Sequence, residues 1–168
     1  MISATSPPAT RLPRTVAVGV GVVVREGAPA PDIASTQALK KALLDAEAVV
    51  YNTASSGAYD EDMLKKIGVF DEIQGKLVRL FDGNAVMRRL VEGKGKESGF
   101  GGITDIVLNR DKGVRLVGPL PAETQNYTSY TAALMAISPN AQSARAFMTY
   151  LASRDGRALF AANGISEP

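Results

Sequence analysis

The stretch Val16–Val24, with the sequence VAVGVGVVV, decides the fold that the sequence predicts. Valines occupy every second position of it, and the positions between them hold Ala, Gly, Gly and Val. Successive side chains of a β-strand point to opposite faces, so both faces of this strand are apolar. A strand of this kind is typical of the centre of a sheet that is covered on both sides.

Strand and helix patterns alternate on the C-terminal side of this stretch. Ser35 or Thr36 can cap a helix that runs to about residue 46, and apolar strands are predicted at 48–51, 76–81, 99–103 and 114–117. Further helices are predicted at 58–67, 85–92 and 104–109, at 140–151 with Asn140 as cap, and after a cap at Ser153. This alternation predicts an α/β domain with a mainly parallel sheet.

Residues 127–137 are predicted to form a long strand. Tyr127, Ser129 and Thr131 alternate with Thr128 and Tyr130 at its start. Two interpretations remain open. The segment is either a half-buried strand, or a connection between lobes whose Tyr or Ser side chains line a cleft.

The composition excludes several function classes. The 168 residues include no His and no Cys, which removes zinc sites built on these residues, cysteine nucleophiles and Ser-His-Asp triads. A formal net charge of +2 without a run of like charges gives no indication of nucleic acid or membrane binding. No paired carboxylates or Ser-x-x-Lys motif follow a predicted strand. The sequence therefore predicts a binding protein and not an enzyme, with no cofactor and no metal.

Two strand-to-helix junctions carry small or amide residues, YNTASSG at 51–57 and FDGNA at 81–85. A helix that starts there presents free backbone N–H groups, and Ser hydroxyls add further donors. Ligands of α/β sheets collect at the carboxyl ends of strands, so the two junctions would hold an anion or a polar solute. The alternative interpretation is that these residues are ordinary helix caps.

The acidic run at 60–62 argues against strong anion binding at the first junction. These three residues are expected in the first helical turn, exposed to solvent, where their charge offsets the positive end of the helix dipole.

A series of short motifs supports a more specific interpretation. In order, they are 16–24 followed by GAPAPD, LKKALL at 39–44, SGAY at 56–59, LKKIGV at 64–69, GFGGITD at 99–105, VGPLPAE at 117–123, and a C-terminal stretch from ARAF at 144–147 to GI at 164–165. Together they resemble the molybdate-type periplasmic solute-binding proteins of ABC transporters, over nearly everything from about residue 14 onward.

The resemblance implies a type II periplasmic-binding-protein fold, in which two α/β lobes joined by crossing strands close around a ligand. Residues 27–114 would form the complete second lobe. Residues 14–26 and 115–168 would form crossing strands and part of the first lobe, behind a disordered or extended leader at 1–13. The implied function is that of the solute-binding component of an ABC-type importer. It would work in the periplasm, bind an oxyanion or another small anion, and contact the membrane subunit of the transporter.

The resemblance also implies the site. Ser56 matches a position whose backbone holds the oxyanion, and Asn84, Ala85 or Val86 matches the second junction. The candidate ligand-binding residues from both junctions and the neighbouring motifs are Thr53, Ser55, Ser56, Gly57, Tyr59, Asn84, Ala85, Val86 and Thr104.

This sequence departs from the family pattern in two ways. The family's opening segment supplies half of the first lobe, and a short Ser/Pro-rich leader stands in its place here. A ligand-contacting Tyr of the family aligns near Gly102. The first departure predicts a half-formed site and exposed apolar faces, covered in a homo-oligomer or a domain-swapped dimer. The alternative functions are a truncated, self-associating remnant that binds no ligand and an effector-sensing domain.

Overall fold

The computed structural model describes residues 16–135 and 138–166, and side chains except those of residues 55–57 and 166. The predicted leader at 1–13 lies outside this range. The chain divides into a larger unit, Val18–Thr128, and a smaller unit made of Met1–Ala17 and Ser129–Pro168. The predicted lobe at 27–114 lies within the larger unit, and the lobe boundaries remain a prediction.

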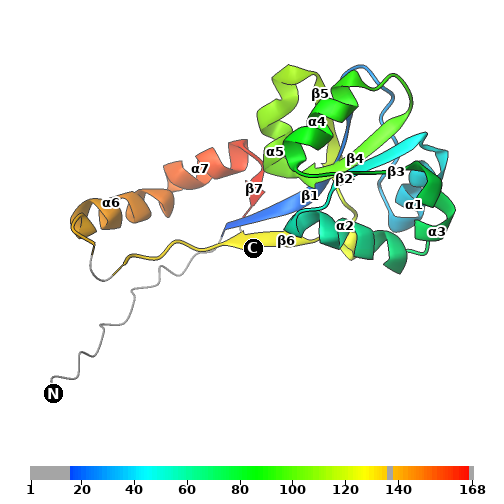
Figure 1. Ribbon diagram of the computed structural model, residues 1–168. Helices are drawn as coiled ribbons and strands as arrows, with labels where there is room; N and C mark the ends of the chain where they lie inside the picture. The colour runs from blue at the N-terminus through cyan, green and yellow to red at the C-terminus, as the bar shows by residue number, and fades with distance from the viewer. Residues whose placement is uncertain (1–15, 136–137, 167–168) are drawn as a thin grey trace. The chain divides into compact units, whose positions relative to one another are not determined.

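The larger unit is built on a sheet whose strands lie in the order β3-β2-β4-β1-β5 (Figure 1). These strands are β1 (Val16–Arg25), β2 (Ala48–Asn52), β3 (Leu77–Leu80), β4 (Glu97–Gly102) and β5 (Val114–Pro119). The strands β2, β3 and β4 run parallel, whereas β1 runs antiparallel to both β4 and β5. The sheet is therefore mixed, and the prediction of a mainly parallel sheet is wrong at β1. An alternation of strand and helix patterns does not specify the direction of the first strand.

Helices cover both faces of this sheet, as the two apolar faces of β1 predict. Val20 and Val22 of β1 belong to one core cluster with residues of α1 (Thr36–Asp45), α2 (Ser55–Lys66) and α3 (Phe70–Ile73). Val23 belongs to a second cluster with residues of α4 (Gly83–Glu92) and α5 (Ile103–Asn109). The central position of β1, between β4 and β5, confirms the prediction made from its sequence.

The start of α1 agrees with the sequence prediction, whereas the start of α2 differs from it. The Ser35 hydroxyl accepts a hydrogen bond from the Ala38 amide at 3.1 Å, which confirms this N-cap. Helix α2 begins at Ser55, three residues before the predicted start. The reason is local, because the Asn52 side-chain oxygen accepts from the Ala54 amide at 2.9 Å and turns the chain into the helix directly after β2.

The segment after residue 126 forms a shorter strand than predicted. Strand β6 covers Tyr127–Tyr130, and residues 136–137 of the predicted strand lie outside the described range. Tyr127 and Tyr130 are each 57% exposed, so the half-buried interpretation is wrong. A Tyr/Ser/Thr pattern offers no apolar face that would keep a longer strand packed. Strands β6 and β7 (Ile165–Ser166) pair with β1.

Two helices of the smaller unit lie where the sequence predicts them. They are α6 (Ala141–Leu151) and α7 (Arg154–Ala162). The Ser153 hydroxyl accepts from the Gly156 amide at 3.2 Å, which confirms the predicted cap of α7. Asn140 occupies the N-cap position of α6 without a capping bond from its side chain.

Candidate functional site

Three strand-to-helix junctions lie at one edge of the sheet. Strands β3, β2 and β4 are parallel neighbours, so the junctions to α4, α2 and α5 all follow the carboxyl ends of these strands (Figure 1). The first two junctions are in direct contact, because the Thr53 amide donates to the Leu80 carbonyl at 2.8 Å and the Thr53 hydroxyl to the same oxygen at 3.3 Å. The structure thus brings together the two junctions that the sequence singled out.

The start of α2 differs from those of α1 and α7, which are capped by a serine side chain. Its N-cap residue, Ala54, makes no side-chain capping bond, and the first intrahelical bond runs from the Ala58 amide to the Ala54 carbonyl. The amides of Ser55, Ser56 and Gly57 therefore have no partner within the helix. The first turn contains no acidic residue, so the expected placement of the 60–62 run in that turn is wrong. We call these three amides the α2 site.

The start of α4 is already occupied by an acid. The Asp82 carboxylate accepts from the Ala85 amide at 2.7 Å, and the Asp82 carbonyl accepts from the Val86 amide at 3.2 Å. The Val86 side chain is buried in the core, whereas Asn84 is exposed. Of the three predicted residues at this junction, Asn84 is the one whose amide has no partner within the helix.

A second acid lies near the starts of α4 and α5. A Cβ atom placed on Gly83 would lie 3.3 Å from the Asp105 carboxylate, and one placed on Gly102 would lie 3.4 Å from it. The Asp105 carboxylate therefore lies beside the start of α4 and the end of β4, close to the predicted residue Thr104. Acidic side chains, Asp82 and Asp105, thus lie at these two helix starts, whereas the first turn of α2 contains no acidic residue.

Tyr59, the remaining predicted residue, connects α2 to the segment after β5. Its hydroxyl donates to the Thr124 carbonyl at 2.8 Å. Burial, and then the neighbouring Asp60, raise the pKa of Tyr59. The hydroxyl stays neutral near pH 7 and fixes the first turns of α2 in place.

The sequence analysis missed Asp60 as a functional candidate. Asp60 is 1% exposed, so the interpretation of the acidic run as solvated is wrong at this residue. Its Oδ1 atom is buried and has no hydrogen-bond partner among the described residues. Burial raises the pKa of Asp60 to about 7. The signal was available, because Asp60 lies three and four residues before the buried Met63 and Leu64 and so shares their helix face.

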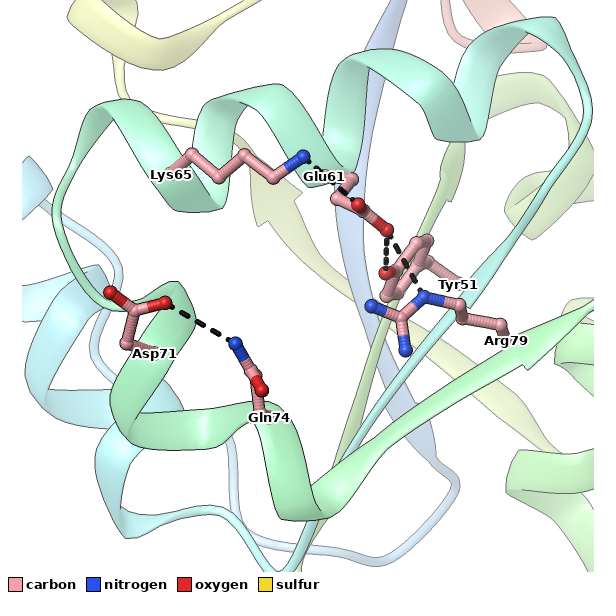
Figure 2. A network of polar contacts seen from close by, with 6 residues as sticks. All are labelled: Tyr51, Glu61, Lys65, Asp71, Gln74 and Arg79. Atoms are coloured by element: carbon pink, nitrogen blue, oxygen red, sulfur yellow. Dashed lines mark hydrogen bonds and ion pairs between the residues drawn. The ribbon is translucent and has the colours of Figure 1, made fainter.

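Glu61, the next residue, is partly exposed and binds three partners (Figure 2). The Tyr51 hydroxyl donates to Glu61 Oε2 at 2.7 Å, Arg79 Nε donates to the same oxygen at 3.0 Å, and Lys65 Nζ lies 3.0 Å from Oε1. The Arg79 guanidinium also lies 5.6 Å from the centre of the Tyr51 ring. The cluster ties α2 to β2 and to the edge strand β3, and so positions the α2 site.

We expect Glu61→Gln to lower the free energy of unfolding by about 1 kcal/mol near pH 7, since the side chain is partly exposed and its ion pairs are screened by solvent. Hydrogen bonds from Tyr51, Lys65 and Arg79 lower the pKa of Glu61 to about 2 from an ordinary value of 4.5. This stabilisation is therefore present above pH 4.5 and is lost as the pH falls toward 2.

Urea unfolding at several pH values measures this effect. The difference between Glu61→Gln and the unsubstituted protein should shrink as the pH falls through this window. Glu92→Gln, at an exposed position of α4, is the control and should change stability by less than about 0.5 kcal/mol. A constant difference from pH 7 to pH 2 would contradict the role given to the Glu61 carboxylate.

A pocket of about 290 Å³ lies at a different place in the larger unit. It is lined by the loop at 28–32, by α1 residues such as Lys41 and Asp45, and by Lys96 just before β4. This is the side where β2 and β4 begin, opposite to their carboxyl ends. The pocket contains none of the predicted ligand-binding residues.

Solved structures define the class of the fold. The substrate-binding domain of a putative molybdenum ABC transporter from Clostridium difficile matches 95% of this chain and 69% of its own, with a TM-score of 0.72 and 20% identity. The periplasmic molybdate-binding protein of Azotobacter vinelandii matches 94% of this chain and 70% of its own, with a TM-score of 0.63 and 17% identity. PEB3 of Campylobacter jejuni bound to L-phospholactate matches 95% of this chain and 68% of its own, with a TM-score of 0.67 and 12% identity. The α/β fold is therefore that of periplasmic binding proteins, as predicted.

The family follows from the sequence of the chain itself. Residues 12–166 match the family model of bacterial extracellular solute-binding proteins, and the chain belongs to this family. This confirms the resemblance to solute-binding proteins. Within the described residues, we find no helix that is both long enough and apolar enough to span a membrane.

A curated relative corrects one prediction. Aconitate isomerase of a Pseudomonas species is 30% identical over 146 residues, which cover 87% of this chain and 55% of the relative. The chain thus spans about half the length of that relative. The prediction that the chain is not an enzyme is wrong, because this relative is an enzyme. The absence of His and Cys excluded particular mechanisms and not catalysis as a whole.

Proposed function

We propose that this chain binds a small anionic solute at the α2 site. The observation that carries the proposal is the start of α2, where Ala54 makes no side-chain cap and the first turn has no acidic residue, whereas the two neighbouring helix starts hold Asp82 and Asp105. Free amides and the positive end of a helix dipole favour an anion at such a position. Thr53 and Ser55–Gly57 would surround the anion, with Asn84 and Thr104 on the adjacent junctions and Tyr59 holding the helix.

The comparisons favour a polycarboxylate as the solute. The aconitate isomerase relative, at 30% identity, is nearer in sequence than the proteins with molybdate or phospholactate in their names, at 12–20%. Aconitate carries three carboxylates, and each of them is an acceptor for backbone N–H groups. Molybdate and other oxyanions remain in the test.

The family also supports a cellular setting. We propose that the chain acts in the periplasm as part of an ABC-type importer, where it meets the membrane subunit of the transporter. Self-association would cover exposed apolar side chains of the smaller unit, such as Phe147 and Leu159. A remnant that binds nothing and an effector-sensing domain are the alternatives that the experiments below distinguish.

A thermal-shift panel tests the proposal, with trans-aconitate, cis-aconitate, citrate, molybdate, tungstate, sulfate and phosphate as ligands. We expect stabilisation of about 2.7 kcal/mol by a bound anion at a hundredfold excess over its Kd. The aconitates should give the largest shift. Sodium chloride at matched ionic strength is the control. No shift with any of these anions would favour the remnant.

A second candidate function is the isomerisation of aconitate, which the curated relative favours. Proton NMR of trans-aconitate incubated with the protein would follow the appearance of cis-aconitate. Conversion above the rate of a buffer blank would support this function. Binding without conversion would leave the chain as a solute-binding protein.

A further inference from the structure

Asp60 lies one helical turn behind the α2 site. Residues three and four positions apart share a helix face, so Asp60 shares a face with Ser56 and Gly57. Side chains on a helix tilt toward its N-terminus, so the Asp60 side chain leans toward the first turn of α2. One helical turn is about 5.4 Å long, so an anion at the α2 site would lie close to this carboxyl group.

Within the part of the chain that the structure describes, no cation pairs with Asp60. The residue is 1% exposed, and its Oδ1 atom has no hydrogen-bond partner among the residues that the structure describes. An unpaired buried carboxylate is costly, and burial accordingly raises the pKa of Asp60 to about 7. The group therefore exists in both protonation states near neutral pH.

Other titratable groups around α2 either have partners of their own or are exposed. On the adjacent junctions, Asp82 accepts from the Ala85 amide, and burial raises the pKa of Asp105. On the helix, Glu61 binds Lys65 and Arg79, Tyr59 binds the Thr124 carbonyl, and Asp62 and Lys66 are exposed. The elements that pack against α2 are β2, β4 and α3. Tyr51 of β2 donates to Glu61, and Glu97 of β4 pairs with Arg89. In α3, Asp71 accepts from Gln74 and Glu72 pairs with Lys40.

We propose that Asp60 determines the charge preference of the α2 site, so that an anion binds there with Asp60 protonated and the ionised form of Asp60 takes up a proton on binding. This inference rests on the proposed function. A charged Asp60 would repel a nearby anion, whereas the neutral acid carries no charge and has an O–H donor. By linkage, the bound anion must raise the pKa of Asp60 further.

Titration calorimetry with trans-aconitate between about pH 6 and pH 8.5 tests this inference, because carboxylates with ordinary pKa values stay ionised in that range. For the unsubstituted protein we expect Kd to rise about tenfold with pH, and the observed heat to depend on the ionisation enthalpy of the buffer. Asp60→Asn should bind with a Kd that does not change with pH. Asp62→Asn is the matched control, since it removes the same charge from an exposed position of the same helix, and it should keep the pH dependence.

The possible results separate the inference from the proposed function. A Kd that is the same at all pH values, without proton uptake, would overturn the role of Asp60 and leave the anion site in place. Equal pH dependence in Asp60→Asn and the unsubstituted protein would do the same. Absence of binding at every pH would overturn both proposals. If Asp60→Asn does not fold, as judged by circular dichroism, Asp105→Asn decides, because burial also raises the pKa of Asp105. Proton uptake that persists in Asp105→Asn supports the role of Asp60, and its loss overturns that role.

Discussion

Phe100→Ala is expected to lower the free energy of unfolding by about 3–5 kcal/mol, the range for truncation of a fully buried Phe. Phe100 lies in β4, pairs with Val22 of the central strand β1, and has no exposed surface. It belongs to the core cluster that packs α1, α2 and α3 against the sheet. The loss would come from the removed apolar contacts and from the cavity that the alanine leaves.

Phe81→Ala is the matched control, because Phe81 is 84% exposed and the chemical change is the same. This variant should change stability by less than about 0.5 kcal/mol. Urea unfolding of both variants measures the difference. Equal losses in the two variants would contradict the described core.

Ser56→Asp is expected to weaken anion binding by at least tenfold, which follows from placing a negative charge within the first turn of α2. Ser56 is the second residue of that helix. An acid at a helix start is favourable for the helix itself, so the variant should fold with unchanged or slightly higher stability. A loss of affinity would then report on the site and not on folding.

Gln37→Asp is the matched control for this variant. Gln37 is exposed and is the second residue of α1, so the charge change and the helical position are the same. Titration calorimetry with trans-aconitate should give the unsubstituted Kd for Gln37→Asp. If both variants bind like the unsubstituted protein, the anion is held elsewhere.

Much of the fold was predictable, because its signals are local. The alternating valines of β1 specify a strand with two apolar faces, and Ser35 and Ser153 each accept the capping bond that their helix start predicts. The direction of β1 was not predictable in the same way, since strand pairing depends on residues 75–100 positions away in the chain, such as Gly102 opposite Val20. The four-residue helix α3 is too short to give a periodic pattern.

The candidate site was predictable in its position and not in its electrostatics. The small residues after β2 and β3 indicated two junctions, and the Thr53–Leu80 contact brings them together. The early start of α2, set by the Asn52 side chain, moved the acidic run out of the first turn.

Backbone amide shifts in a ¹⁵N-resolved NMR titration with trans-aconitate would locate the bound anion. We expect the amide signals of Ser55, Ser56 and Gly57 to shift most and to saturate together. Smaller shifts are expected at Asn84 and Thr104 on the adjacent junctions. Saturable shifts confined to the loop at 28–32 and Lys96, around the pocket at the other end of β2 and β4, would contradict this expectation, and so would the absence of any saturable shift.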